Sequence, residues 1–349
     1  MSFDEPRVFG QWVTWEHAAE GLSGRLDESA MAGLHDAYRY AASRHEGQRR
    51  PAGEPYVRHL LEVVEIMATA LDVTDADMLE AGLLHDVVED TDGTSAEITE
   101  RFGGRTADLV AHVTMPEILP GQDKRLVRLA YLDGLRDARP DVLRLKLSDR
   151  YSNVQRLHTH PRAEKQRSYY AETLEHFVPL AKVDDRLAEL FAVWAEAYDY
   201  LTAPVDTISA ATKLAAAVHR EQVDKSGAPY VEHAYATARI ALEDGASEHQ
   251  QMAGLLHDAV EDTPCTLEQL RDLGVPEPVV VMVDALTRRD GESHPEYLAR
   301  LIETPEAVPV KRADIQHNQS PDRLARLDSA TQDRLRGKYE AALAALSRS

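Results

Sequence analysis

Apolar positions recur along most of the chain at intervals of three and four residues, with polar positions between them. Such spacing gathers the apolar side chains on one face of a helix. Runs of Val, Ile and Thr that would predict strands are scarce, and Ala, Leu, Glu and Arg dominate the composition. The sequence therefore predicts an all-α fold, with helices over 28–45, 59–71, 75–88 and 163–178.

One block of this pattern occurs twice in nearly the same form. AGLLHDVVEDT at 81–91 and AGLLHDAVEDT at 253–263 agree at ten of eleven positions, more than chance supplies. In both copies a His stands 14 positions before the His of a Pro-Tyr-Val-x-His block, and an Asp-x-x-x-Asn block follows later. The chemically distinctive members are His45, His59, Asp149 and Asn153 in the first copy, and His219, His233, Asp314 and Asn318 in the second.

The two copies predict two tandem domains. From the second His to the His-Asp pair, and from that pair to the distant Asp, the first copy has 26 and 64 positions and the second has 24 and 57. Differences of this size belong to loops between shared elements. The segment LTAPVDT around Pro204 interrupts the helical pattern. We therefore expect one helical bundle over 1–203 and a second, shorter bundle over 204–349.

The repeated block concentrates ionisable side chains beside an apolar Ala-Gly-Leu-Leu segment. Read as one helix over 81–91, it places His85 one turn before Glu89 and puts the two Asp side chains on the adjacent stripe. Charged groups next to a packed apolar segment are costly when they are unpaired. A divalent cation bound between them would remove that cost.

The predicted metal ligands are two imidazoles and two carboxylates in each copy. This mixed nitrogen and oxygen set suits Mn²⁺, Fe²⁺ or Zn²⁺ better than Ca²⁺, which prefers oxygen alone. Two carboxylates neutralise the dication and leave positions open for substrate and for a water molecule that can attack phosphorus near neutral pH. The two ligand sets are His59, His85, Asp86 and Asp149, and His233, His257, Asp258 and Asp314.

Glu89 and Asp90 remain beside the predicted metal as a second carboxylate pair. Crowding raises the pKa of one carboxyl of such a pair, which prepares a proton donor or acceptor. The pair could instead position a second cation or orient the water, and the sequence leaves these roles open. A His-Asp pair alone carries no such signal: His35-Asp36 lacks the Glu-Asp that follows and is predicted to be a surface pair.

Composition and charge narrow the function classes. The net charge of −21 argues against binding long nucleic acid, and a small anionic substrate would need basic residues gathered at its pocket. No apolar run of 18 residues predicts a membrane span, and the N-terminus lacks the layout of a signal peptide. The single cysteine, Cys265, excludes a disulfide framework. We expect a cytoplasmic protein, and the sequence does not indicate its oligomeric state.

Residues 27–183 resemble the N-terminal hydrolase domain of the RelA/SpoT homologues and the small stand-alone alarmone hydrolases. The resemblance runs through HEGQRRPAGEPYVRH, AGLLHDVVEDT, FGGRTADLVAHVT, KLSDRYSN and YAETLEHFVPLA. It implies an HD-type helical domain that uses Mn²⁺ to remove the 3′-pyrophosphate of guanosine tetra- or pentaphosphate. No second module resembles the synthetase domain of the long RelA/SpoT proteins, so synthesis of the alarmone is not expected.

Position by position, the resemblance implies the same four metal ligands in the first copy, with Glu89 and Asp90 as catalytic carboxylates. It implies that Arg50 and Asn153 contact the nucleotide. The family often has a basic residue after the position of Arg50, where this chain has Pro51, and this difference leaves the nucleotide specificity open. Neighbouring side chains that could supply local positive charge are Arg44, Arg49, Lys146 and Arg150.

The second half resembles shorter stand-alone HD phosphohydrolases. Its Glu261 and Asp262 match the catalytic pair, and Asn318 matches Asn153. Several substrate-side positions differ, so we predict a working metal site with a different or weaker substrate preference, in which Lys225 compensates in part. The replacements are Val223-Asp224 for Arg49-Arg50, Ala228 for Glu54 and Ile315 for Arg150.

Three functions therefore stay open, all with a small nucleotide as the expected partner. The first is an alarmone hydrolase acting on guanosine or adenosine 3′-pyrophosphates. The second is a phosphohydrolase with the same metal chemistry acting on another nucleotide or a nucleotide cofactor. The third is a nucleotide-sensing or partner-binding protein in which one domain is regulatory.

Overall fold

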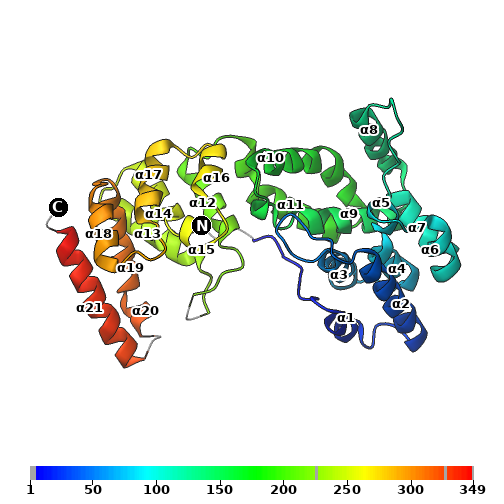
Figure 1. Ribbon diagram of the computed structural model, residues 1–349, viewed down its shortest axis with the longest axis horizontal. Coiled ribbons are helices and arrows are strands. Elements are labelled where there is room, and N and C mark those ends of the chain that lie inside the picture. Colours follow the sequence, from blue (N-terminus) through cyan, green and yellow to red (C-terminus); the bar gives the residue numbers. More distant parts are fainter. Residues whose placement is uncertain (1–4, 225–226, 326–327, 348–349) are drawn as a thin grey trace. The chain divides into compact units, whose positions relative to one another are not determined.

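The computed structural model describes residues 5–224, 227–325 and 328–347, and in this part of the chain every regular element is a helix (Figure 1). The extended pairings there are two isolated antiparallel bridges, Arg49 with Pro55 and Val223 with Pro229. The predicted all-α fold is confirmed. The chain divides into two compact units: unit 1 runs to residue 160 and takes in 168–197, and unit 2 takes in 161–167 and continues from 198.

Unit 1 contains the first copy of the repeated blocks. Its α-helices are α1 (Trp15–Leu22), α2 (Glu28–Arg44), α3 (Val57–Glu65), α4 (Ala76–Leu84), α5 (Val87–Asp90), α6 (Ser95–Phe102), α7 (Gly104–Val113), α8 (Lys124–Gly134), α9 (Pro140–Val154), the second half of α10 (Ala163–Glu172) and α11 (Asp185–Ala197). Short 3₁₀ or π turns follow several of them: η1 (Ile66–Ala70), η2 (Leu135–Asp137), η3 (Leu157–Thr159), η4 (Thr173–Phe177) and η5 (Val178–Val183).

Side-chain caps fix where several of these helices begin. Asp27 accepts a hydrogen bond from Ala30 N at the start of α2, and Asp75 accepts one from Met78 N at the start of α4. Thr94 and its partner three residues later form a capping box on α6. The helix predicted over 28–45 is confirmed as α2, and the one predicted over 59–71 continues as a π turn after α3.

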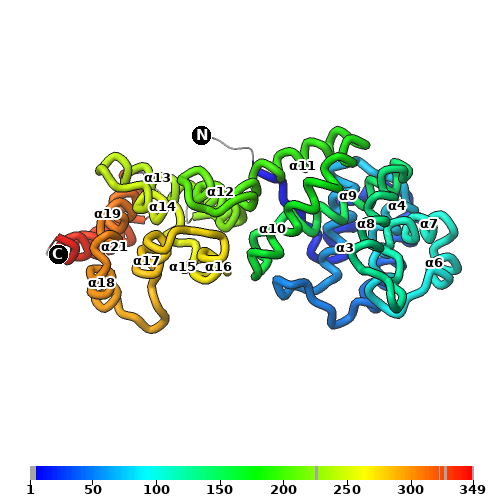
Figure 2. The backbone as a smooth tube through the Cα atoms, turned by 90° about the horizontal axis from the view of Figure 1, so that it is seen from above, coloured from blue at the N-terminus to red at the C-terminus, as the bar shows by residue number. Residues whose placement is uncertain are grey.

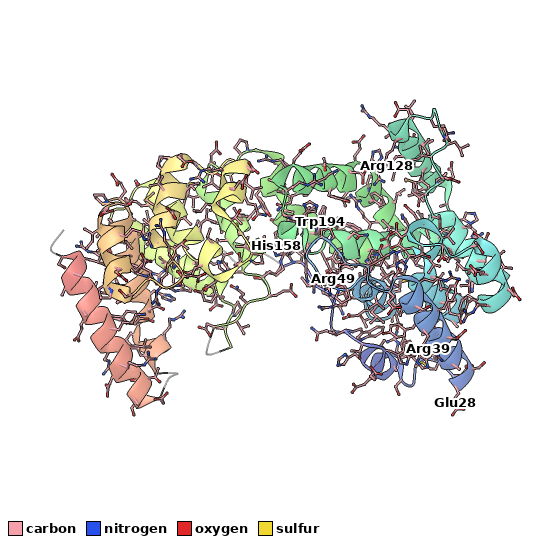
Figure 3. The ribbon with its side chains drawn as sticks, in the orientation of Figure 1. Glu28, Arg39, Arg49, Arg128, His158 and Trp194 are labelled. Atoms are coloured by element: carbon pink, nitrogen blue, oxygen red, sulfur yellow. The ribbon has the colours of Figure 1, made fainter. Side chains whose placement is uncertain are left out.

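Three helices carry the site of unit 1. α3, α4 and α9 lie side by side (Figure 2). α4 also packs against α2 and α7. Buried Leu and Val side chains of these helices form the core between them. Trp194 on α11, which Figure 3 labels, is fully buried and donates from Nε1 to the Val154 carbonyl at the end of α9, 2.9 Å away. α9 therefore contacts α11 as well as α3 and α4.

Unit 2 repeats this arrangement with fewer elements. Its α13, α14 and α19 contact one another as α3, α4 and α9 do in unit 1. The site helices of both units are thus equivalent in order and in packing. The elements from 198 onward are η6 (Asp199–Thr202), α12 (Ile208–Val218), α13 (Val231–Glu243), α14 (Glu248–Leu256), α15 (Ala259–Asp262), α16 (Leu267–Asp272), α17 (Glu277–Leu286), α18 (His294–Ile302), α19 (Ala307–Asn318), α20 (Pro321–Leu324) and α21 (Ser329–Leu346).

None of the helices in the described ranges combines the length and the apolar character that crossing a bilayer requires.

Candidate metal centres

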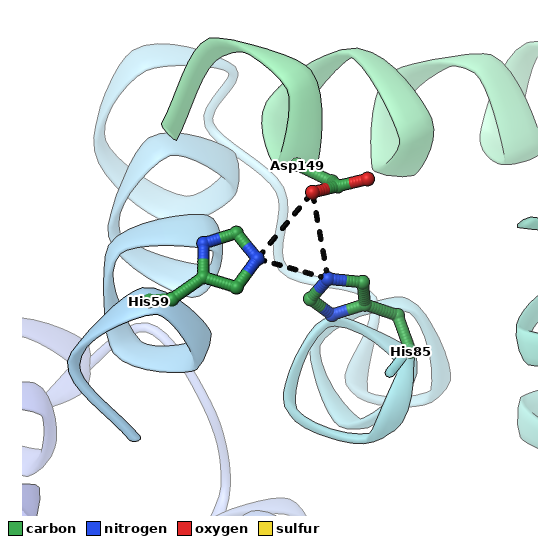
Figure 4. A group of neighbouring side chains, drawn as sticks. All are labelled: His59, His85 and Asp149. Atoms are coloured by element: carbon green, nitrogen blue, oxygen red, sulfur yellow. Dashed lines mark hydrogen bonds and ion pairs between the residues drawn. The ribbon is translucent and has the colours of Figure 1, made fainter. Parts of the chain in front are cut away.

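Side chains from α3, the end of α4 and α9 converge in unit 1 (Figure 4). The Nε2 atoms of His59 and His85 lie 3.2 Å apart. Asp149 Oδ1 lies 3.4 Å from the first of these nitrogens and 3.6 Å from the second. All three side chains are buried, and their ligand atoms lie within reach of a single metal ion. His85 stands 26 positions after His59, and Asp149 a further 64 positions on, yet the three side chains meet at one point.

Asp86 completes the cluster. Its Oδ2 atom lies 3.0 Å from His85 Nε2 and 3.4 Å from His59 Nε2. Both members of the His-Asp pair therefore face the same point, although side chains of consecutive residues in a regular helix diverge by about 100°.

A break in the helix explains how consecutive residues share one point. The prediction of a single helix over 81–91 is wrong, because α4 ends at Leu84 and α5 begins at Val87. Asp86 has φ −97° and ψ −2°, and this conformation interrupts the helical hydrogen bonds. The same break separates α14 from α15 in unit 2, where Asp258 has φ −98° and ψ −2°.

In each imidazole, the hydrogen bond made by Nδ1, which points away from the cluster, decides whether Nε2 carries a proton or a lone pair. His85 Nδ1 lies 2.9 Å from the Gly82 carbonyl oxygen, which only accepts, so this nitrogen carries the ring proton. In the neutral ring Nε2 is then unprotonated and faces two carboxylates. Lone pairs and carboxylates that face one another require a cation between them, and a divalent metal ion fits this donor set.

The pKa values of the clustered side chains also indicate that positive charge is favoured at this point. Burial acts to lower the pKa of His85, but Asp86 and Asp149 outweigh it and hold that pKa well above its usual range. Burial acts to raise the pKa of Asp149, but the Lys146 ammonium, 2.9 Å away, and the imidazoles hold it well below its usual range. The cluster therefore favours a positive charge at this point, which either a proton or a metal ion can supply.

A buried chain of hydrogen bonds orients His59 from behind. Its Nδ1 lies 2.9 Å from Ser152 Oγ, and Ser152 donates to Glu62 Oε2 at 2.7 Å. Glu62 is buried and also accepts from Arg50 at 3.0 Å and from Arg156 at 2.8 Å. Because Ser152 donates its one proton to the carboxylate, it accepts the Nδ1 proton of His59. The Nε2 lone pair is thereby directed into the cluster, where a metal ion could bind it.

Glu89 and Asp90 lie beside the cluster but have separate partners. Glu89 accepts from Met115 N at 3.0 Å, and desolvation beside the neighbouring carboxylates raises its pKa. Asp90 accepts from the Tyr56 hydroxyl at 2.9 Å, and the same hydroxyl lies 2.6 Å from Asp86 Oδ2. A carboxyl with a raised pKa next to a metal site is suited to proton transfer.

Two cavities adjoin the centre. One, of about 260 Å³, is lined by Asp86, Glu89, Asp90 and Asp149 together with Lys146 and Arg150. The other, of about 190 Å³, is lined by Arg50 and Pro51 with Leu157 and other residues. Asn153 and Tyr169 line both cavities, so the two are neighbours. Asn153 also donates to the metal-facing Asp149 Oδ1 at 2.6 Å.

The basic residues selected from the sequence are placed differently. Lys146 lies in the acidic cavity, and Arg50 faces the other one. Arg150 is buried, with its guanidinium donating to Thr173 Oγ1 and its charge paired with Glu172. Arg49, labelled in Figure 3, is exposed, donates to the Gly53 carbonyl and is not among the residues that line either cavity. Arg44 pairs with Asp92 and Glu97 on the surface of the unit.

Unit 2 brings its own set together in the same way. His233 Nε2 lies 3.2 Å from Asp314 Oδ1 and 3.5 Å from Asp258 Oδ2. His257 Nε2 lies 2.9 Å from Asp258 Oδ2, is buried and has no hydrogen-bond partner in the described part of the chain. Its Nδ1 faces the Gly254 carbonyl at 2.8 Å. A buried nitrogen lone pair without a donor is suited to a metal ion.

The surrounding contacts of the second centre are partly conserved between the copies. Lys311 contacts Asp314 at 2.7 Å and Asn318 donates to it at 2.6 Å, as Lys146 and Asn153 contact Asp149. Glu261 accepts from Arg288 N at 2.8 Å, as Glu89 accepts from Met115 N. Asp262 follows Glu261 at the end of α15.

Other contacts of the second centre differ. His233 Nδ1 contacts His317 Nδ1 at 2.7 Å, where unit 1 has the Ser152 hydroxyl. Ala236 stands three positions after His233, where unit 1 has Glu62 after His59. Among the described residues, the position of the carboxylate behind His59 is thus taken by an alanine behind His233. Lys225, expected to compensate for the lost arginines, lies outside the described residues.

Tyr56 and Tyr230 are contacts that the sequence reasoning missed. Each hydroxyl lies 2.6 Å from the Asp of the His-Asp pair in its own unit, Asp86 or Asp258. The signal was present, because both tyrosines stand in the repeated Pro-Tyr-Val block. Ser152 and Glu62 had no such signal, since they differ between the copies and meet only in the folded chain.

An all-helical unit that gathers two imidazoles and two carboxylates around one point defines a metal-binding domain of the HD class. A family model described as HD domain matches residues 37–185 and 211–320, which together are more than half of the chain. The chain belongs to this family, and the predicted relationship is confirmed. Each of the two matched segments contains one of the two clusters.

Curated relatives share part of the chain. A guanosine-3′,5′-bis(diphosphate) 3′-pyrophosphohydrolase of Aquifex aeolicus is 40% identical over 169 residues, which are 48% of this chain and 24% of that protein. The bifunctional (p)ppGpp synthase/hydrolase SpoT of Escherichia coli K12 is 37% identical over 161 residues, 45% of this chain and 22% of that protein. The aligned region thus spans about a quarter of the length of these relatives.

Among solved structures, one described as "A metazoan ortholog of SpoT hydrolyzes ppGpp and plays a role in starvation responses" is 28% identical to this chain. The match covers 46% of this chain and 94% of that chain, with a TM-score of 0.41.

Proposed function

We propose that the first metal centre hydrolyses the 3′-pyrophosphate of guanosine or adenosine alarmones such as ppGpp and releases pyrophosphate. One observation carries the proposal: the acidic cavity at the metal cluster and the cavity beside Arg50 share Asn153 and Tyr169. A substrate with a pyrophosphate at one end and a nucleoside at the other needs two such neighbouring pockets. The names of the curated relatives support this substrate class.

The proposed metal ion is Mn²⁺, with Fe²⁺ or Zn²⁺ also compatible with the ligands. When bound, such an ion supplies a Lewis acid that activates water and offsets the negative charge of the phosphates. The proposed ligands are His59, His85, Asp86 and Asp149, and in unit 2 His233, His257, Asp258 and Asp314.

The remaining side chains would handle protons and phosphate charge. Glu89, with its raised pKa, would take a proton from the attacking water. The bond between phosphorus and the 3′-oxygen then breaks, and Asp90 would assist proton delivery to that oxygen. Lys146 would offset phosphate charge in the acidic cavity. Glu261 and Asp262 would take the corresponding roles in the second centre.

Arg50 and Asn153 would contact the nucleoside side of the substrate. Arg50 is already anchored by Glu62 and donates to the Ser152 carbonyl at 3.1 Å, so its guanidinium plane is fixed before a base or phosphate arrives. Asn318 is the counterpart proposed for unit 2. Arg49 remains a predicted contact without a place in either cavity.

Release of pyrophosphate tests this proposal. Purified chain incubated with ppGpp and Mn²⁺ should release one pyrophosphate per nucleotide consumed, and EDTA should stop the release. The matched control is His85→Ala, which removes one ligand from the first centre only. Release by the wild type no greater than release by this variant would overturn the proposal.

A second candidate is hydrolysis of another nucleotide or of a nucleotide cofactor by the same centre. Pro51 favours it, because this residue lines the cavity where relatives often carry a basic side chain. Turnover of a panel of nucleotides at equal concentration separates the two candidates. The alarmone proposal requires the highest kcat/KM for substrates with a 3′-pyrophosphate.

We further propose that 1–203 and 204–349 are the two functional domains of a cytoplasmic enzyme, and that the second could be regulatory. The acidic Asp224 at the position of Arg50 motivates the regulatory role. If Asp86→Ala abolishes nucleotide turnover while Asp258→Ala leaves binding and turnover unchanged, the second domain is structural or regulatory toward nucleotides.

A further inference from the structure

Asp90 is held at two of its atoms by side chains from outside its own helix. α5 ends at Asp90, so the carbonyl of this residue is among those that hydrogen bonds within the helix leave unsatisfied. It accepts instead from Gln48 Nε2, 3.0 Å away. The Asp90 carboxylate accepts from the Tyr56 hydroxyl at 2.9 Å. Gln48 and Tyr56 are themselves joined, because Tyr56 N donates to the Gln48 carbonyl at 3.0 Å.

His45 contacts both of these side chains. Its ring stacks on that of Tyr56, with the centroids 4.7 Å apart and the planes 15° from parallel. Its Nδ1 lies 2.7 Å from Gln48 Oε1. Because the Gln48 amide donates through Nε2 to a carbonyl, its oxygen is the atom that faces His45, and Nδ1 carries the ring proton. The Nδ1 proton of His45 therefore fixes which way the Gln48 amide points.

The other ring nitrogen of His45 argues against a role in packing alone. His45 is 3% exposed, and its Nε2 has no hydrogen-bond partner in the described part of the chain. An unpaired buried nitrogen destabilises a fold, so an apolar side chain of similar size would serve packing better. Neither His45 nor Gln48 is among the residues that line the two cavities of the first centre. What His45 supplies is the Nδ1 donor and the plane of its ring.

The same arrangement recurs in unit 2. His219 Nδ1 lies 2.6 Å from Gln222 Oε1, and Gln222 Nε2 donates to the carbonyl of Asp262, the last residue of α15. The His219 ring lies 5.1 Å from that of Tyr230, and no partner for the buried His219 Nε2 occurs among the described residues. The two residues between the His and the Gln differ between the copies, as do the two after the Gln. The copies have thus diverged around this arrangement without losing it.

We propose that His45, Gln48 and Tyr56 are positioning residues that aim the Asp90 carboxylate at the reacting atoms of the first centre. The inference rests on the proposed function, in which Asp90 assists proton delivery to the 3′-oxygen. Proton transfer requires a donor within hydrogen-bond reach, and a displacement of about 1 Å can lower the rate about 100-fold. The three side chains limit that displacement, because they hold Asp90 at its carbonyl and at its carboxylate.

The test measures kcat and KM for ppGpp with Mn²⁺, metal content and Tm for variants of the full chain. His45→Leu removes both the Nδ1 donor and the unpaired nitrogen, so it should lower kcat about 10- to 100-fold without lowering Tm. Gln48→Glu replaces the Nε2 donor by an oxygen that repels the Asp90 carbonyl, and it should lower kcat to a similar extent. KM and metal content should stay near the wild-type values. Tyr56 is left unchanged, because its hydroxyl also contacts Asp86, a proposed ligand.

Two further variants separate a positioning role from a structural one. His45→Asn keeps an N–H donor near the place of Nδ1, so it should retain kcat within about threefold of the wild type. Gln122→Glu is the matched control for Gln48→Glu. Gln122 is exposed, and its Oε1 accepts from Leu119 N, which a Glu can also do. The control should change kcat less than about twofold.

Several results would overturn the inference. If His45→Leu and Gln48→Glu change kcat no more than Gln122→Glu does, the positioning role is wrong and the proposed function stands. A loss of metal or a fall in Tm that accounts for the loss of kcat would make these residues structural. If His45→Asn loses as much activity as His45→Leu, the Nδ1 donor is not what matters. Absence of pyrophosphate release by the wild type would overturn the proposed function, and this inference with it.

Discussion

The Nδ1 atom of His59 lies 2.9 Å from the Oγ atom of Ser152, 93 residues further along the chain. This contact joins an imidazole of the His-Asp cluster to the buried Glu62, because Ser152 donates to that carboxylate. In unit 2 the equivalent partner of His233 is another imidazole, His317. The two clusters thus gather the same residue types, but a hydroxyl supports the imidazole of His59 and a second imidazole supports that of His233.

Ser152→Ala should weaken Mn²⁺ binding at the first centre about 10- to 100-fold, because His59 loses the acceptor that fixes its ring. The three other donors to Glu62 remain, so the fold should be preserved. Titration of metal-free chain with Mn²⁺, followed by electron paramagnetic resonance of the free ion, measures the change. His317→Ser is the matched change in the second copy, and equal affinities in wild type and Ser152→Ala would contradict the role assigned to Ser152.

The wild-type chain should hold about two equivalents of divalent metal. His85→Ala and His257→Ala should each reduce the content to about one, because each removes a ligand from one centre only. Elemental analysis after dialysis measures this. His35→Ala is the control, since this His of a His-Asp pair is exposed and stacks on Trp15. A wild-type content of one equivalent would mean that only one of the clusters binds metal.

Glu89→Gln should lower kcat about 10²- to 10⁴-fold while leaving the metal content unchanged. The amide keeps the shape of the side chain and can still accept from Met115 N, but it cannot take a proton. Steady-state kinetics with elemental analysis of the same sample separates the two effects. Glu117→Gln, which changes a nearby exposed carboxylate, should have almost no effect. Loss of metal in Glu89→Gln would instead make Glu89 a ligand.

Arg50→Ala should reduce kcat/KM about 10- to 100-fold and lower the free energy of unfolding by about 1–3 kcal/mol, because charged hydrogen bonds to Glu62 and the Ser152 carbonyl are lost. Arg49→Ala should change the free energy of unfolding by less than about 0.5 kcal/mol, since its side chain is exposed and contacts only the Gly53 carbonyl. Urea unfolding and nucleotide kinetics test both variants. If Arg50→Ala and Arg49→Ala changed kcat/KM and the free energy of unfolding equally, the different roles assigned to these two arginines would be wrong.

The metal-free chain should lose stability as the pH rises from 6 to 9.5. Burial acts to lower the pKa of His257, but Asp258 and Asp314 outweigh it and raise this pKa to about 9. The protonated ring stabilises the folded metal-free chain fully below the pKa of an unfolded His, about 6.5, and this stabilisation disappears as the pH rises through 9. Burial acts to raise the pKa values of Asp258 and Asp314, but the neighbouring imidazoles and Lys311 hold them below their usual range, so these two carboxyls stay ionised and contribute no change.

Metal binding should show the opposite dependence, because it requires the unprotonated ring. Below pH 9, binding at the second centre should release about one proton and tighten about tenfold per pH unit. Thermal unfolding of EDTA-treated chain and Mn²⁺ titrations at several pH values measure both trends. In His257→Ala the pH dependence of metal-free stability should shrink. A metal-free chain that becomes more stable toward pH 9.5 would contradict the charge balance described for the second centre.

Much of the fold followed from local pattern. The spacing of apolar residues was enough to place α2 and to identify the class, because a helix forms wherever one face can be buried and its ends can be capped. The break between Leu84 and Val87 was missed. No Gly or Pro marks this break, and the meeting of His85 and Asp86 at one point becomes apparent only in the folded chain.

The sequence by itself determined the duplication, the helical class and the side chains available for a metal, because these depend on residue identity and on spacing within single helices. The tertiary structure decided that Ser152 and Glu62 support His59, and that Arg50 faces a cavity while Arg49 lines neither cavity. These relationships join residues far apart in the chain. Their distances are set by how helices pack, and packing depends on the whole core rather than on any single segment.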